Sequence, residues 1–218
     1  MYKRQILNRF NNVTAAVTEN LEKFELGMAV SKLYDFIWDD FCDWYIELAK
    51  IRMNGADEES ADSARRVLVW TMSNTLKLLH PFMPYITEEI WQTLPHDGEA
   101  LIVAKWPEYD EALSFPQEAK NLENVMALIR AIRTRRNEMN VPPSKKAHIY
   151  IDSAHPAPYE EASEFIARLA YGSKVEIGTG FDVQGAVTAV TDDAKALLPM
   201  DDLVDKAAVS YTHLRAHE

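Results

Sequence analysis

Apolar residues recur every three or four positions through most of the first 140 residues, a spacing that places them on one side of an α-helix. The clearest stripe runs from about Met28 to Ile51 and consists of Val30, Leu33, Tyr34, Ile37, Phe41, Trp44, Tyr45 and Leu48. The same spacing predicts a helix from Ile6 to about Phe24 and another from Glu58 to Leu79. Gly27 is the expected break between the first two helices.

Prolines indicate where the later helices begin and end. Pro81 ends the third helix, and Pro84 can open a short fourth one because the first helical turn needs no proline N–H. Residues 96–116 hold glycine, proline and several acids, so we expect a long connection over the surface. Helical spacing returns from Pro116 to Asn140, where a Pro-Pro pair forbids continuation.

The pattern changes after these prolines. Three short segments rich in β-branched residues, Ala147–Ile151, Lys174–Ile177 and Ala186–Val190, predict strands, and Pro158–Leu169 between the first two has helical spacing. The predicted fold is therefore mostly α: a helical bundle over residues 6–140, including the surface connection, followed by a small α+β domain over residues 141–208.

The amino-acid composition argues against several classes of protein. A net charge of −11 argues against nonspecific coating of nucleic acid, which depends on a surplus of Lys and Arg. The single cysteine, Cys42, can form neither an intramolecular disulfide nor a four-cysteine zinc site. No apolar run reaches the roughly 18 residues of a membrane span, and no signal peptide is recognisable, so we expect a cytoplasmic protein with no membrane partner.

The sequence contains no recognisable pattern of catalytic residues. The six histidines are scattered, and none lies one helical turn from another or from Cys42. No glycine-rich phosphate loop is present, and Asp39 and Asp43, one turn apart, are better explained as a solvated helix face than as a metal site. We therefore expect no metal, no cofactor and no catalytic residues in this chain.

Positive charge is concentrated between Arg130 and Lys146. On a helical wheel the side opposite the apolar residues carries Arg130, Arg133, Asn137 and Asn140. Two lysines, Lys145 and Lys146, continue this face beyond the prolines. Such a face suits RNA, because Arg grips phosphate or stacks on a base and Asn can bind a base edge. The alternative is a solvated face paired with the abundant acids. Arg136 projects toward the apolar side, which favours a structural role in pairing a buried carboxylate.

The second helix offers aromatic residues that could stack on unpaired bases. Phe36 lies off the apolar stripe and Trp38 at its flank, and Lys50 and Arg52 near the helix end could meet an RNA backbone. For Phe36, burial against a neighbouring helix is the alternative interpretation.

Two longer strings resemble a known family. Leu33–Glu47 has the sequence LYDFIWDDFCDWYIE and Leu79–Trp91 has LHPFMPYITEEIW. The second is similar to the anticodon-binding bundles of class I synthetases for valine, isoleucine and leucine, and the first resembles the valyl-tRNA synthetases in particular. Ile129–Arg133 and Asn140–Lys146 also resemble the valine family, and the likeness extends over about Ile6 to Ala208.

The resemblance implies that the chain recognises the anticodon stem-loop of valine tRNA, as the C-terminal portion of a ligase whose ATP-dependent chemistry is carried by a catalytic domain. The family's ATP-handling signatures are absent here, so the chain alone is expected to be inactive. Two alternatives remain: the same portion of an isoleucyl- or leucyl-tRNA synthetase, and a stand-alone helical module that binds protein.

Both ends depart from the family pattern. Met1–Gln5 and Val209–Glu218 resemble translated adapter sequence, and we expect them to be non-native ends that pack poorly.

Overall fold

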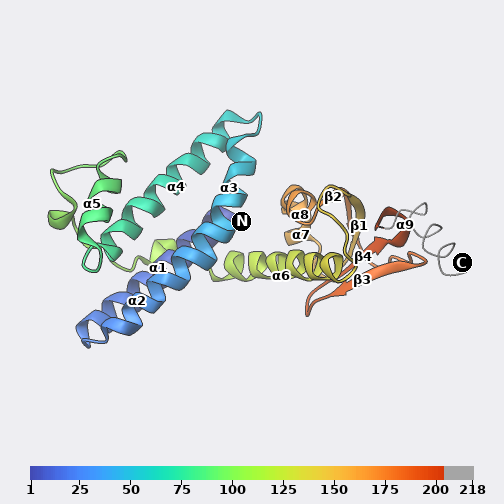
Figure 1. The fold of residues 1–218 in the computed structure, drawn as a ribbon, viewed down its shortest axis with the longest axis horizontal. Helices are drawn as coiled ribbons and strands as arrows, with labels where there is room; N and C mark the ends of the chain where they lie inside the picture. Colours follow the sequence, from blue (N-terminus) through green and yellow to red (C-terminus); the bar gives the residue numbers. More distant parts are fainter. Residues whose placement is uncertain (204–218) are drawn as a thin grey trace, which may run out of the picture. The chain divides into compact units, whose positions relative to one another are not determined.

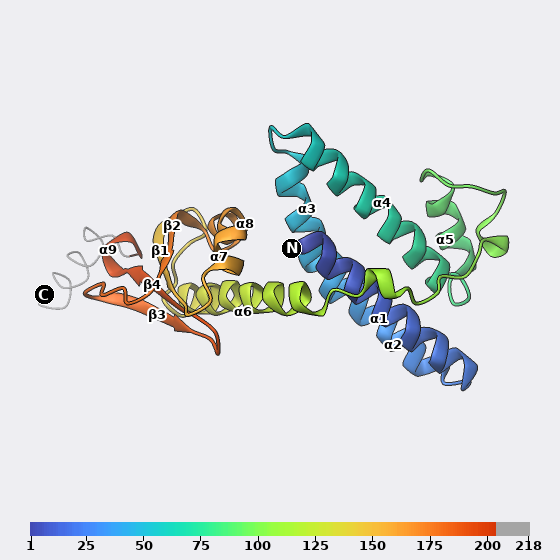
Figure 2. The same cartoon turned by 180° about the vertical axis from the view of Figure 1, so that it is seen from behind.

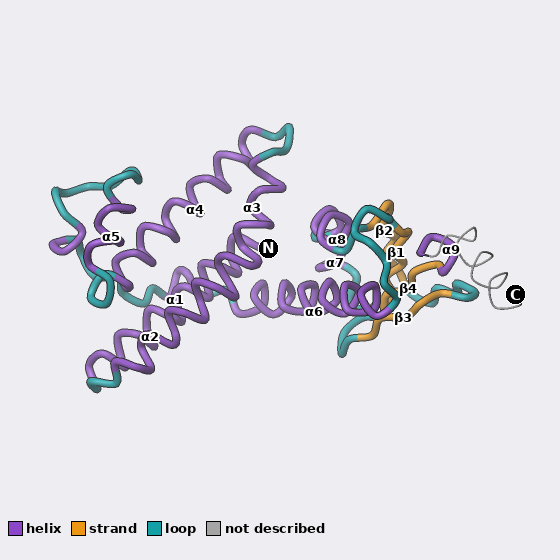
Figure 3. The backbone as a smooth tube through the Cα atoms, in the orientation of Figure 1, coloured by secondary structure: helices purple, strands orange, loops and turns teal. Residues whose placement is uncertain are grey.

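The computed structural model describes residues 1–203. They form two compact units, Met1–Ala119 and the part that begins at Lys120, and each unit has a distinct architecture. The first consists of helices and loops, whereas the second combines helices with a β-sheet (Figures 1 and 3). The predicted fold class, a helical bundle followed by a small α+β domain, is confirmed.

The first unit opens with two helices that lie side by side, α1 (Tyr2–Glu22) and α2 (Leu26–Asp35) (Figures 1 and 2). The chain reverses at Phe24, which has a left-handed backbone with φ of 59°. The N–H of Glu25 donates to the carbonyl of Asn20, a bond that closes the end of α1. Gly27 lies inside α2, so the predicted break is three residues too late.

The helix does not stop at Asp35 but changes its winding. A π-helical segment, η1 (Phe36–Tyr45), follows α2 directly and leads into α3 (Ile46–Met53). Bonds from residue i to i+5 widen each turn by about one residue, which changes which positions share a face. The buried residues of η1 are Phe36, Asp40, Phe41, Trp44 and Tyr45, whereas Tyr34 from the predicted stripe is exposed.

Helix α4 (Glu58–Leu79) spans the predicted residues, and its N-terminus is capped by the Asp57 side chain, which accepts from the N–H of Ser60. Helix α5 (Pro84–Trp91) begins at a proline, as predicted. Two single 3₁₀ turns follow, η2 (Leu101–Val103) and η3 (Glu111–Leu113). Leu76, Trp91 and Leu101 form a buried apolar cluster that joins α4, α5 and η2.

The connection between α5 and α6 is held against α1 by side-chain amides. Asn11 makes two hydrogen bonds of 2.9 Å with the backbone of Asp110, one as donor and one as acceptor. One turn earlier, Asn8 accepts from the N–H of Phe115 at 2.8 Å. Because these amides satisfy backbone groups that no helix or strand pairs, they fix a segment without regular structure.

The N-terminal residues belong to the folded unit, so the prediction that Met1–Gln5 pack poorly is wrong. Tyr2 is 5% exposed, and its ring centroid lies 5.9 Å from that of Tyr45. Lys3 donates to Ser63 at 2.7 Å, and Gln5 is buried. These residues pack because α1 begins at Tyr2 and places them beside the segment η1 and α4. The other predicted poor end, Val209–Glu218, lies outside the described residues.

The second unit is built on a four-stranded sheet. Its strands are β1 (Ala147–Asp152), β2 (Gly172–Gly178), β3 (Ala186–Val190) and β4 (Lys195–Pro199), in the spatial order β2-β1-β4-β3. Only the β1–β2 pair is parallel. Helices α7 (Ala157–Glu161) and α8 (Ser163–Leu169) form the crossover between these two strands, and α9 (Met200–Leu203) follows β4.

Strand β4 was not predicted from the sequence, although it lies inside the sheet. Ala196, Leu197 and Leu198 are all buried, so the strand lacks the alternation of apolar and polar residues by which half-buried strands are recognised.

Helix α6 (Pro116–Glu138) connects the two parts of the chain. Leu122, Val125, Leu128, Ile129 and Ile132 line its buried side. The compact units divide after Ala119, so most of α6 groups with the sheet, whereas the sequence pattern grouped it with the bundle. No helix within residues 1–203 is long and apolar enough to cross a bilayer.

Candidate nucleic-acid interface

The C-terminal end of α6 carries the predicted basic face. Arg130, Asn137 and Asn140 are exposed, as is Lys146 beyond the prolines, whereas Lys145 is half-buried. Glu138, the acid between Arg130 and Lys146, pairs with Arg135 at 2.8 Å. Arg135 lies outside the predicted face, so this pair leaves the cations of the face un-neutralised by Glu138. The structure thus leaves amide and cationic groups of this face accessible to solvent.

Asn140 owes its position to the way α6 ends. Its backbone is left-handed with φ of 54°, a conformation that Asn adopts more readily than other residues with a side chain. The N–H of Val141 then donates to the carbonyl of Arg136 at 2.9 Å, which closes the helix before Pro142. The turn therefore directs the chain from α6 toward Lys145 and Lys146.

Arg133 differs from its neighbours because its side chain is half-buried and already bonded. Its Nε donates to the carbonyl oxygen of Leu169 at 2.6 Å, and its guanidinium carbon lies 5.9 Å from the centre of the Tyr171 ring. These contacts join α6 to the C-terminal end of α8. RNA contact by Arg133 stays a prediction, but the structure already gives this residue a role in packing.

Arg136 points toward the apolar side, as predicted, and is only 2% exposed. Within residues 1–203 it pairs with no carboxylate: its Nη2 donates to the carbonyl oxygens of Pro142 and Lys145, and its guanidinium carbon lies 5.4 Å from the centre of the Tyr171 ring. Burial lowers the pKa of this guanidinium. The predicted carboxylate partner is therefore wrong, because the helix end itself supplies the acceptors.

The aromatic candidates of the second helix separate into one exposed and one buried residue. Trp38 is 52% exposed, with its ring centroid 6.1 Å from that of Tyr34, and remains a candidate for stacking. Phe36 is 1% exposed and packs edge-on against Phe10 of α1 at 5.9 Å. The prediction of Phe36 as a stacking residue is corrected: Phe36 follows the buried Leu33 by three residues, so it continues the buried side of α2, and the alternative of burial holds.

The two cations near the end of this helix already interact with other side chains. Lys50 pairs with Glu47 at 2.5 Å on the surface, an arrangement that costs little to break. Arg52 is half-buried, and its charge acts on Tyr2, where it opposes the rise in pKa that burial causes. Trp38, Lys50 and Arg52 belong to the first compact unit and the basic face to the second, so the structure provides two separate groups of candidates.

Sequence reasoning missed Tyr34 as an accessible aromatic residue, because helical spacing assigned it to the core. The available signal was its position four residues before Trp38, which places the two aromatic residues on the same side of the helix.

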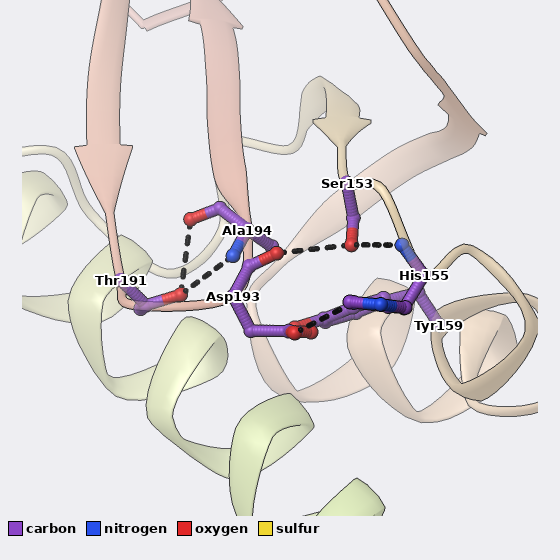
Figure 4. A network of polar contacts seen from close by, with 6 residues as sticks. All are labelled: Ser153, His155, Tyr159, Thr191, Asp193 and Ala194. Carbon is purple, nitrogen blue, oxygen red and sulfur yellow. Dashed lines mark hydrogen bonds and ion pairs between the residues drawn. The ribbon is translucent and has the colours of Figure 1, made fainter.

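A polar network in the second unit contains Ser, His and Asp but has the geometry of a structural tie (Figure 4). Ser153 donates through Oγ to the carbonyl of Asp193 at 3.0 Å and accepts from the N–H of His155. The Asp193 carboxylate contacts His155 Nδ1 at 3.2 Å and accepts from the Tyr159 hydroxyl at 2.8 Å. Because the serine is bonded to backbone groups, the network fixes the turn between β3 and β4 to α7.

Comparison with known proteins agrees with this architecture. Residues 3–151 match the family described as "Anticodon-binding domain of tRNA ligase". The chain belongs to this family.

Full-length relatives specify which ligases the chain is similar to. It is 42% identical over 204 residues to a valine–tRNA ligase from Bacillus licheniformis, a match that covers 92% of this chain and 23% of the relative. The corresponding enzymes from Staphylococcus aureus and Bacillus cereus are 40% and 42% identical over the same length. The chain thus spans less than a quarter of the length of these relatives.

Proposed function

We propose that this chain recognises the anticodon stem-loop of valine tRNA, as part of a cytoplasmic ligase that joins valine to tRNA with ATP. The observation that carries the proposal is the match of residues 3–151 to anticodon-binding domains, together with the likeness to valine–tRNA ligases. In this proposal the chain needs no cofactor of its own, because binding is its contribution and activation of valine belongs to the remainder of the ligase.

The charge distribution supports RNA as the partner. In a chain of net charge −11, the exposed face that ends α6 presents Arg130, Asn137 and Asn140, followed by Lys146. Cations of this kind displace counterions from phosphate, and amides can read a base edge. Trp38, with half of its surface exposed, could stack on an unpaired base.

The test is binding of the purified chain to valine tRNA and to the same tRNA with an exchanged anticodon, at about 50 and 200 mM salt. We expect tighter binding of the valine anticodon at both concentrations, and a strong fall in affinity as salt rises. Equal binding of both tRNAs would show that the chain does not recognise the anticodon. No binding at low salt would favour a protein-interaction module instead. Preference for an isoleucine or leucine anticodon would assign the chain to a sister ligase.

A matched pair of variants locates the interface. Arg130→Ala removes a cation from the proposed face, whereas Arg168→Ala removes an exposed cation from α8. If Arg130 meets a phosphate, its loss should lower the magnitude of the salt slope by roughly 0.7 to 0.9, and the Arg168 variant should leave the slope unchanged. Identical behaviour of the two variants would count against this face.

A further inference from the structure

A second surface with the chemistry of an RNA site lies in the first unit and includes none of the candidate tRNA-binding residues named above. A hollow of about 720 Å³ lies between the outward side of α4 and the segments that follow α5. Its size falls in the range of about 300 to 1,000 Å³ that is typical of pockets for small ligands, and is therefore adequate for a nucleotide. The α4 residues that line it recur at helical spacing from Arg65 to Lys77, so they share one face of that helix.

The hollow is cationic in an acidic protein. Arg65, Arg66, Lys77 and Lys105 line it, against a single acid, Asp97. The chain as a whole carries −11, so this local surplus of positive charge is opposite in sign to the total. A concentration of cations in a concave surface focuses the field and attracts anions.

Arg65 already pairs with Asp62 at 2.6 Å, but the other three cations of the hollow are available. Arg66 is exposed and forms no hydrogen bond or ion pair in the part of the chain that the structure describes. Lys77 donates to the Asn74 side chain at 3.2 Å, a bond between a charge and a neutral amide. Lys105 pairs with Glu108 at 3.3 Å, with both side chains more than two-thirds exposed. Exposed pairs contribute little, so exchange for a phosphate is inexpensive.

A flat aromatic surface accompanies the charges. Trp70 lines the hollow and is 38% exposed, although it lies in the middle of α4. The ring of Phe10 meets it edge-on, with centroids 5.3 Å apart and planes at 78°, and this contact holds the indole in place. A base that leaves its stack requires such a fixed, partly open ring.

We propose that this hollow binds a nucleotide of the tRNA in an unpaired stretch. Arg66, Lys77 and Lys105 take the phosphate groups, and the base lies against Trp70. The inference rests on the proposed function, since it adds a second contact region to the same RNA partner. A neighbouring hollow of about 360 Å³ shares Trp70, Lys77 and Lys105 with the first, which allows the strand to continue past one nucleotide. Charge together with an open indole favours RNA over an acidic protein segment, which has no base to stack.

The experiment measures valine tRNA binding by the purified 218-residue chain in which Arg66→Ala and Lys77→Ala are combined. The control combines Lys32→Ala and Arg168→Ala, which also removes two charges but from α2 and α8. If both mutated cations of the hollow meet phosphates of an unpaired strand, the magnitude of the salt slope falls by about 1.4, which is 0.7 for each phosphate. The control keeps the wild-type slope.

The aromatic contact has a separate readout. Trp70→Leu should weaken tRNA binding roughly tenfold while leaving the salt slope unchanged, because stacking involves no counterions. Trp70→Phe retains a ring and should keep most of the affinity. Thermal melting of each variant shows whether loss of the contact with Phe10 has unfolded the unit. If Trp70→Leu is unfolded, Trp70→Phe still tests the stacking prediction.

The outcomes distinguish this inference from the proposed function. If tRNA binding weakens with Arg130→Ala but the variant lacking Arg66 and Lys77 matches its control, the hollow is not an RNA site and the proposed function stands. If the wild-type chain binds no tRNA at low salt, both fail. If the variants of the hollow lose binding of polyglutamate but not of tRNA, the occupant is an acidic protein segment and the inference is overturned.

Discussion

The Nε of Arg133 donates to the carbonyl oxygen of Leu169 across 2.6 Å, and this bond joins the last turns of α6 to the end of α8. On a helical wheel Arg133 lies on the same side as Arg130, yet of the two only Arg130 is exposed. The carbonyl at the end of α8 has no intrahelical partner, so a cation there satisfies an acceptor that would otherwise be unpaired. A residue selected as an RNA contact thus has a structural role in the second unit.

Arg133→Ala should lower the free energy of unfolding by about 1 to 2 kcal/mol, because a hydrogen bond with a charged donor is lost at a half-buried site. Urea unfolding of the variant measures the loss. Arg130→Ala is the control and should change stability by less than about 0.5 kcal/mol. Unchanged stability of the Arg133 variant together with weaker tRNA binding would instead make Arg133 an RNA contact, as the sequence pattern indicated.

Asn11→Ala should destabilise the first unit by about 1 to 3 kcal/mol, since it leaves both backbone groups of Asp110 without their side-chain partner. The connection before α6 should also become more open to protease, which limited proteolysis can follow. Asn12→Ala, at an exposed neighbouring position, is the matched control. Equal cleavage of the two variants would show that the amide does not hold this segment.

Deletion of Met1–Gln5 should destabilise the chain, contrary to what its foreign composition suggests. The Tyr2 ring is buried against Tyr45, and Tyr2→Ala alone should cost about 3 kcal/mol by analogy with other buried aromatic residues. Thermal melting measures both changes, with the exposed Arg4→Ala as control. A melting temperature unaltered by the deletion would mean that these residues are dispensable.

Stability should fall in alkaline solution because of buried tyrosines. Burial raises the pKa of Tyr45 and of Tyr159, and the hydrogen bond to Asp193 raises that of Tyr159 further. The neutral phenol is thus favoured in the folded state. The stabilisation is fully present below the unfolded pKa of about 10 and is lost progressively as the pH rises above it.

Tyr159→Phe isolates one contribution to this pH dependence. The variant loses the hydrogen bond to Asp193 at every pH, but above about pH 10 its free energy of unfolding should decline less steeply than that of wild type, by up to about 1.4 kcal/mol per pH unit. Urea unfolding of both proteins between about pH 8 and 11 provides the comparison. Both contain the same lysines, so the titration of lysine contributes equally to the two curves and cancels in their difference. Parallel curves would show that Tyr159 ionises normally.

The isolated chain should not activate valine. Its sequence holds no glycine-rich phosphate loop and none of the family's ATP-handling signatures, so no group is arranged to stabilise the charge of adenylyl transfer. Valine-dependent pyrophosphate exchange by highly purified chain should be undetectable. Exchange above the level of a mock purification would contradict this assignment of roles.

The amino-acid sequence alone determined the class of fold and most of the elements. Helices α4 and α5 follow from their apolar spacing and from the positions of Pro81 and Pro84, because helical periodicity and proline chemistry are local properties. The exposed part of the basic face could be predicted for the same reason, since Arg130 and Asn137 lie opposite a long apolar stripe on a regular helix.

Tertiary structure decided what local spacing could not. The side of the second helix that α1 covers decided the burial of Phe36 against Phe10, a choice that depends on the packing of two helices. Burial of Ala196–Leu198 on both sides concealed β4, because a strand inside a sheet has no polar face to reveal its period. Arg66 and Lys105 lie far apart in the sequence, and only the return of the chain after α5 brings them to one hollow. Trp70 of α4 lines the same hollow.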